Sequence, residues 1–283
     1  FANKIWNLAR FTLMNLEDFN SVLSPKSSSL SLADKWILSR LNKTIEEVAK
    51  GIDEYSFDHA ANAIYQFIWH EFCDWYIEMI KPDLKGENGT ERKQVSQSVL
   101  VNVLKDSLKL LHPFMPFITE EIWAALPHEA GVGSQESEVR SIMQMPFPEA
   151  VADYPDAERD MTCIMDVIKA IRNIRSEMNI PPSANIDVIL KTESDEERQL
   201  LKSGEFYIRI LTKASDFRLE TQDTRLQTPE DAASAVVGNI EIFIPLKGLI
   251  NLDEEIIRLE KEMDKILKEI SGLEKRLSNK DFL

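Results

Sequence analysis

The first sixteen residues carry the side-chain pattern best suited to binding chemistry. At about 100° per residue of an α-helix, the apolar residues share one broad face that should be buried: Ala2, Ile5, Trp6, Leu8, Ala9, Leu13 and Leu16. The opposite face holds Asn3, Lys4, Asn7, Arg10, Phe11 and Met14, and no acidic residue precedes Glu17. This combination suits single-stranded nucleic acid, because a ring stacks on an unpaired base while amides read base edges and cations hold phosphate. The pattern equally allows an alternative, in which another element covers Phe11 and makes it part of a wider core.

Two further clusters are weaker candidates. Lys169, Arg172 and Arg175 share a helical face opposite Ile164, Ile168 and Ile171, but such a ladder is more often paired with acidic neighbours than with RNA. His70, Cys73 and Asp74 are spaced to hold a metal ion from one helix. No fourth ligand is evident, so we expect a buried Cys73 beside aromatic residues and no metal.

Catalytic signatures are missing from the sequence. It has no Gly-rich phosphate loop, no His-Glu-x-x-His, no Gly-x-Ser-x-Gly and no Cys-x-x-Cys. We therefore predict no catalytic residue in this chain, and with nine glycines in the whole chain a backbone phosphate cradle is not expected.

Composition indicates a globular protein of two or three domains. The 283 residues are 43% hydrophobic and 29% charged, and no run approaches the roughly 20 apolar residues of a membrane helix. Two cysteines are too few for a disulfide framework, so a cytoplasmic location is expected. The net charge of −15 argues against nucleic-acid binding by the molecule as a whole. The positions of local cation clusters are therefore more informative about nucleic-acid binding than the total charge. Because the chain opens on Phe1, with no signal-peptide layout, we expect a fragment of a longer protein.

The elements that position these residues are predicted to be mainly helices. A first helix spans 2–16 and ends at a Ser/Pro-rich loop around 24–27. Others are expected from a Ser31–Asp34 capping box, over 56–80 with a stop at Lys81-Pro82, over 90–112, over 119–127 with Thr119 as its cap, and over 156–178. A connection over 128–157 should hold one extended piece at 141–146. Short loops between neighbouring helices predict a helical bundle.

After residue 182 the hydrophobic period changes from 3.6 to 2. Strands are expected around Val188, Phe217 and Ile242, with a helix over 193–211 and a tight hairpin at Gly238-Asn239. The tail has a heptad seam, formed by Leu252, Ile256, Leu259, Met263, Ile266, Ile270, Leu273 and Leu277. The predicted domains are a helical bundle over 1–150, a helix plus a small α+β unit over 151–249, and one arm of a coiled coil over 250–283.

Several of these segments resemble the C-terminal anticodon-binding region of valyl-tRNA synthetases, which are class I aminoacyl-tRNA synthetases. The resemblance covers the whole chain. It is carried by residues 3–11 (Asn-Lys-Ile-Trp-Asn-Leu-Ala-Arg-Phe), 33–40, 69–78 with Lys81-Pro82, 110–123, and 172–175 with 180–182. Residues 110–123 are similar in valyl, isoleucyl and leucyl enzymes alike, whereas the first and third helices and the heptads are similar to the valyl family.

The resemblance implies that this chain recognises the anticodon loop of tRNA(Val). An aromatic of the first helix, here Phe11, would stack on the unwound loop, with Lys4 and Arg10 as positive neighbours and Ile77 and Glu78 lining the same pocket. Asn7 and Lys81 are added from helical geometry and position. The full-length enzyme would attach valine to tRNA with ATP and Mg²⁺, in a catalytic domain whose His-x-Gly-His and Lys-Met-Ser-Lys-Ser signatures are missing here. The fragment itself should be inactive and need no cofactor, and its lone heptad helix could pair with another copy.

Two alternatives stay open. One is the equivalent domain of an isoleucyl- or leucyl-tRNA synthetase. The other, from a different class, is an acidic helical adaptor that dimerises through the coiled coil, which leaves the acid-free first helix unexplained.

Overall fold

The computed structural model describes residues 1–16, 19, 29–127, 141–150, 153–220, 231–249 and 252–277. The expected loop at 24–27 and half of the 128–157 connection lie outside these ranges. The chain divides into two compact units, 1–162 and 163–283, and the boundary between them falls within the sequence of helix α7 (Pro155–Glu177). Among the described residues, no helix combines the length and hydrophobicity that crossing a bilayer requires.

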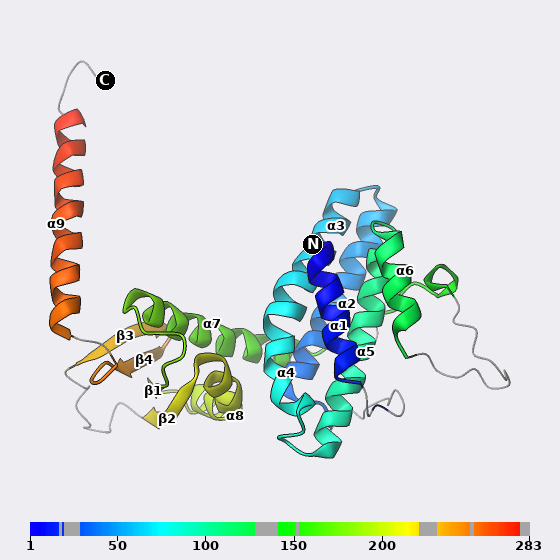
Figure 1. The fold of residues 1–283 in the computed structure, drawn as a ribbon, viewed down its shortest axis with the longest axis horizontal. Coiled ribbons are helices and arrows are strands. Elements are labelled where there is room, and N and C mark those ends of the chain that lie inside the picture. The colour runs from blue at the N-terminus through cyan, green and yellow to red at the C-terminus, as the bar shows by residue number, and fades with distance from the viewer. Residues whose placement is uncertain are drawn as a thin grey trace. The chain divides into compact units, whose positions relative to one another are not determined.

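The first unit is a helical bundle, as predicted (Figure 1). Its central helix is α5 (Thr90–Leu111), which contacts α1, α2, α3, α4 and α6 and is therefore buried on nearly every side. Polar side chains such as Ser96, Gln97 and Ser107 are buried with its apolar ones. The surrounding helices are α1 (Ala2–Met14), α2 (Leu32–Asp53), α3 (Phe57–Gln66), α4 (Ile77–Leu84) and α6 (Pro116–Ala125).

Helix α1 buries a narrower face than the helical pattern predicts. Ile5, Leu8, Ala9 and Thr12 are buried, whereas Trp6 is 51% exposed. The prediction that Trp6 belongs to the core is therefore wrong, because the buried arc of the helix ends just before it. Phe11, at the other edge of the arc, is half-buried.

The long third helix is present but is not uniform. Between α3 and α4 lies a π-helix, η2 (Phe67–Tyr76), so the three segments form one continuous helical run. The predicted stop at Lys81-Pro82 is wrong, since α4 continues through Pro82 to Leu84. Packing of the last turn overrides the proline, because Asp83 is buried and accepts hydrogen bonds from Asn88, Arg92 and Ser96.

Two local predictions after α5 are also wrong. Helix α6 begins at Pro116, a favourable first helical residue, and Thr119 is inside it, where its hydroxyl donates to the Met115 carbonyl. The expected extended piece at 141–146 contains instead a 3₁₀ turn, η3 (Ile142–Gln144). The capping box at the start of α2 is confirmed, because the Ser31 side chain accepts from the Asp34 N–H and the Asp34 carboxylate from the Ser31 N–H.

A buried charge network links α2, α4 and α5. Arg92 pairs with Asp34 at 2.6 Å and with Asp83 at 2.8 Å, and the Tyr76 hydroxyl donates to Asp34 at 2.8 Å. Burial, reinforced by the Asp34 charge, raises the pKa of Tyr76 well above its ordinary value. Burial disfavours a charged Arg92, but its bonds to the two carboxylates outweigh that and raise its pKa.

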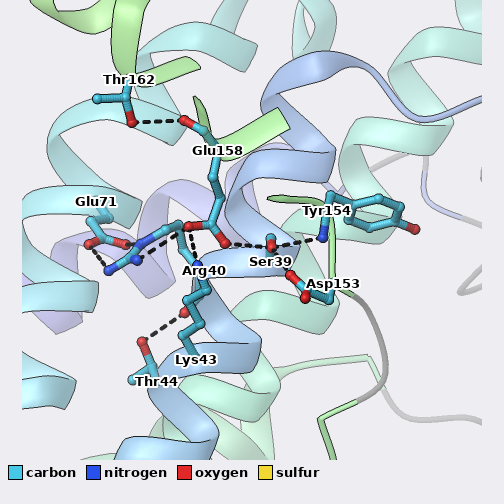
Figure 2. Close-up of polar contacts among 9 residues, drawn as sticks. All are labelled: Ser39, Arg40, Lys43, Thr44, Glu71, Asp153, Tyr154, Glu158 and Thr162. Atoms are coloured by element: carbon cyan, nitrogen blue, oxygen red, sulfur yellow. Dashed lines mark hydrogen bonds and ion pairs between the residues drawn. The ribbon is translucent and has the colours of Figure 1, made fainter. Parts of the chain in front are cut away.

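A second network fastens the start of α7 to α2 and η2 (Figure 2). Glu158 accepts hydrogen bonds of 2.6 Å from Ser39 and from Lys43, and Arg40 lies 3.5 Å from the same carboxylate. Arg40 also donates two parallel bonds of 2.8 Å to Glu71 on η2. Arg40 therefore bridges the carboxylates of Glu71 and Glu158, which links three segments distant in the sequence.

The second unit is built on a four-stranded mixed sheet in the order β2-β1-β4-β3. Strands β1 (Ile186–Lys191) and β2 (Ala214–Glu220) are parallel and joined by α8 (Asp195–Thr212). Strand β4 (Ile240–Pro245) is antiparallel to β1 and to β3 (Ala232–Val237). The predicted hairpin at Gly238-Asn239 is confirmed, with Gly238 at φ 57°.

Helices α7 and α8 approach each other closely in this unit. A Cβ atom at Gly204 of α8 would lie 2.5 Å from the Cδ1 of Ile164, a fully buried residue of α7. Helix α9 (Leu252–Leu277) is continuous over 26 residues. Where its side chains are described, the heptad positions Ile256, Met263, Ile266, Ile270 and Leu273 are about half exposed.

Candidate nucleic-acid interface

The start of α1 lies against η2. The Phe1 ring is 5.2 Å from Tyr65 and 6.3 Å from Trp69 between centroids. Three residues later, the Lys4 ammonium contacts Trp69 and Asp74. Contacts thus advance in the same direction along both segments, so α1 runs parallel to the helical run that it touches.

Lys4 is held by a carboxylate and a ring. Its Nζ is 2.6 Å from Asp74 Oδ1 and 4.7 Å from the centre of the Trp69 ring. Burial raises the pKa of the neighbouring Cys73 thiol to about 12, with the Lys4 charge opposing and the Asp74 charge adding to the rise. Cys73 is therefore a protonated thiol at neutral pH and not a nucleophile.

Phe11 and Asn7 follow Lys4 on the same side of α1. Phe11 is half-buried, so part of its ring faces solvent, and Asn7 is exposed. Among the described residues, nothing forms a hydrogen bond with the Asn7 side chain. A partly exposed ring next to an unpaired amide is the arrangement that base stacking with edge readout requires.

Arg10 lies on the opposite flank of α1. It lines a pocket between α1 and α6, together with Trp6 and Met14. Its side chain is exposed and has no hydrogen bond or ion pair with any described residue. The structure thus does not bring Arg10 and Lys4 together on one flank.

The predicted residues of the third helix lie on α4. Glu78 and Lys81 form an ion pair of 2.6 Å, and both side chains are about 40% exposed. Ile77 is buried, at 7% exposure. Its side chain therefore packs mainly in the core and contributes little to the surface.

The weaker candidates on α7 are engaged inside the second unit. Arg175 is buried and donates to the carbonyls of Thr212, Pro181 and Ala184, and burial lowers its pKa. Arg172 donates to the Leu211 carbonyl, and Lys169 pairs with Asp166 at 2.9 Å.

Trp69 and Asp74 both contact Lys4 in this candidate interface, and the sequence did not predict these contacts. Their only signal was their place in the aromatic third helix, which gives no sign of contact with Lys4. Asp74 also lies 3.6 Å from His70. Among the described residues, no group of three His, Cys, Asp or Glu side chains could hold a metal ion.

Comparison with known proteins decides the family. Residues 34–190 match the anticodon-binding domain of tRNA ligases. The chain belongs to this family. Residues 251–283 separately match the valyl-tRNA synthetase tRNA binding arm.

Relatives of this anticodon-binding domain are valine–tRNA ligases. Those of Syntrophotalea carbinolica, Geobacter sulfurreducens and Bacillus subtilis are 45%, 46% and 42% identical, and each match covers 100% of this chain. The chain spans 31% of the length of each of these relatives. A solved complex of Agrobacterium radiobacter K84 agnB2 LeuRS with tRNA covers 84% of this chain and 23% of its own, at 16% identity and a TM-score of 0.36.

Proposed function

We propose that this chain recognises the anticodon loop of tRNA(Val) as part of a valine–tRNA ligase. The observation that carries the proposal is the match of residues 34–190 to the anticodon-binding domain, in a chain 41–46% identical to valine–tRNA ligases. The match of 251–283 to the valyl arm favours this over an isoleucyl or leucyl enzyme. In the proposed whole enzyme, a separate catalytic part attaches valine with ATP and Mg²⁺, and this chain needs no cofactor.

The parallel course of α1 and the third helical run supports the proposed position of the reading surface. Lys4 meets Asp74, and Phe11 follows seven residues later, about 10 Å further along the axis at 1.5 Å per residue. The same advance beyond Asp74 reaches Ile77–Lys81. Phe11 would then lie level with the Glu78–Lys81 pair, and a base stacked on its ring would have a carboxylate acceptor within reach.

Charge pairing sets the roles of the polar residues in this proposal. Lys4 and Lys81 are each held by a carboxylate at 2.6 Å, so they position that carboxylate as much as they attract phosphate. Both oxygens of Glu78 accept from Lys81, and their remaining lone pairs can accept from an exocyclic amino group of a base. Asn7 offers an amide. Arg10 supplies the cation that has no acidic partner among the described side chains.

Arg175 is left out of the proposed surface, because its guanidinium is used up on three backbone carbonyls. Arg172 and Lys169 remain secondary candidates for contacts with the tRNA outside the loop. For α9, we propose that the half-exposed heptad side chains form one arm of a coiled coil, which would bury them against a second helix.

The test is binding of the chain, at low salt, to a tRNA(Val) anticodon stem-loop and to a copy with the middle anticodon base changed. We expect tighter binding to the first, and Phe11→Ala should weaken that binding by about 1–3 kcal/mol, the usual worth of one base stacked on an aromatic. Tyr55→Ala removes an aromatic that is 82% exposed on the α2–α3 turn and serves as the matched control. Equal binding to both loops would contradict anticodon reading, and unchanged binding of Phe11→Ala would contradict its role.

A further inference from the structure

A second aromatic of α1 faces solvent on the flank away from Lys4. Trp6 is 51% exposed and forms one wall of a groove of about 240 Å³ between α1 and α6. Its apolar surface also includes Met14, which is 64% exposed, and Ile122, which is buried. Pockets for drug-sized ligands hold roughly 300–1,000 Å³, so this groove suits a single ring system and not an extended chain.

Two charged side chains also line the groove. Arg10 comes from α1 and Glu121 from α6. Neither forms a hydrogen bond or ion pair with any described residue, and they do not pair with each other. A cation and a carboxylate that stay apart beside an apolar wall are both available to a ligand.

We infer that the groove binds one unpaired base of the RNA, stacked on Trp6, with its exocyclic amino group donating to Glu121 and its phosphate held by Arg10. This inference rests on the proposed function. It makes Trp6 a second stacking platform for a base, in addition to Phe11. An indole face is sequence-tolerant, because every base has a π-face. Glu121 adds a preference for adenine, cytosine or guanine over uracil, since uracil has no exocyclic amino group to donate.

The chemistry of the groove favours a base over a protein side chain. An aliphatic side chain would use the apolar wall but leave Arg10 and Glu121 without partners. A nucleotide joins an aromatic ring, a donor and an anion in one unit, and it fits all three features. α1 would then contact two bases of the loop, one on each flank.

The experiment labels the chain with 5-fluorotryptophan and follows its fluorine resonances while the anticodon stem-loop is added. The chain has five tryptophans, and the Trp6 signal is assigned from its loss in Trp6→Phe. We expect the Trp6 resonance to shift on binding. Trp6→Ala should weaken binding roughly 5- to 150-fold, the equivalent of one lost stack, while Tyr55→Ala should have no effect.

A double-mutant cycle identifies the base. Stem-loops with an abasic nucleotide at each unpaired position outside the second and third anticodon bases are compared in turn. At one position the abasic change should weaken binding to the wild-type chain and have little effect on Trp6→Ala. Glu121→Gln should weaken binding when that base is adenine, cytosine or guanine, and leave it unchanged when uracil is substituted there.

The outcomes separate the two proposals. If the Trp6 resonance stays in place while RNA binds, and Phe11→Ala still weakens binding, the second stacking platform is overturned and the proposed function stands. A chain that binds no stem-loop at low salt would overturn the proposed function and the inference together.

Discussion

The carboxylate of Glu158 links the start of α7 to α2. Its side chain is 14% exposed and is contacted by Lys43, Arg40 and Ser39. Burial alone would raise the pKa of Glu158, but the hydrogen bonds from Lys43 and Ser39 and the charges of Lys43 and Arg40 outweigh it and lower the pKa. A lowered folded-state pKa means that the ionised form stabilises the fold above the unfolded pKa, and that this contribution is lost as the pH falls through the folded value.

The first prediction concerns Glu158→Gln. At pH 7 the variant should be less stable than the wild type, because Lys43 loses its counter-charge and Arg40 keeps only that of Glu71. The difference should shrink once the pH falls below the ordinary glutamate pKa of about 4.3. Urea unfolding followed by tryptophan fluorescence reports the first unit alone, since all five tryptophans lie within it. Glu46→Gln, at an exposed position of α2, is the control, and a difference that stays constant with pH would refute the role of the charge.

Residues also show why part of the site could not be predicted. The capping box at Ser31 and Asp34 was predictable because it depends on residues three apart in the sequence. The pairing of Lys4 with Asp74 spans 70 residues, and nothing local signals it. Trp6 was misassigned because a helical pattern gives the centre of a buried face but not its edges. The groove between α1 and α6 lies at that edge of the buried face, because Trp6 forms one of its walls.

At the scale of elements, regular periodicity predicted most helices and strands, and tertiary packing accounts for the failures. The π-helix η2 contains the large side chains Phe67, Phe72 and Tyr76, all fully buried. A π-helix is rare, and no pattern of spacing in the sequence distinguishes it from an α-helix. The helix continues past Pro82 because the buried Asp83 and Leu84 hold the next turn in place.

The contact between α7 and α8 gives a prediction at this scale. Gly204→Ala should gain up to about 1 kcal/mol of helix propensity, but its Cβ would collide with the buried Ile164. We expect a net loss of about 1–3 kcal/mol from overpacking. Circular dichroism follows unfolding of both units and tryptophan fluorescence that of the first, so a transition seen only by circular dichroism belongs to the second unit. Ile164→Ala in the same chain should recover part of the loss, with a coupling of roughly 0.5–3 kcal/mol. Strict additivity of the two changes would disprove the collision.

The whole molecule is acidic, with 48 Asp and Glu against 33 Lys and Arg. Diffuse attraction to RNA should therefore be weak, and the proposed binding of the anticodon loop would depend on a few local cations and on stacking. The net negative charge should then disfavour nonspecific RNA.

This leads to a prediction about salt. If Lys4, Arg10 and Lys81 are the cations near phosphate, the logarithm of affinity should fall with the logarithm of salt concentration with a slope of about −2, at roughly −0.7 per phosphate contact on single strands. Arg10→Ala should make the slope shallower by about 0.7. Lys50→Ala changes a cation whose side chain is 73% exposed on α2 and should leave the slope unaltered. A slope several times steeper would point to a larger basic surface than these residues provide.

The contact of α1 with η2 also has a consequence for how the chain is made. A ribosome adds Lys4 some 70 residues before Asp74, which at 5–20 residues per second takes about 4–14 s. During that time η2 is incomplete and α5, which α1 also contacts, has not yet been synthesised. Helix α1, which carries Phe11 and Trp6, is thus synthesised before the segments on which it packs, and it can dock only after they have been added.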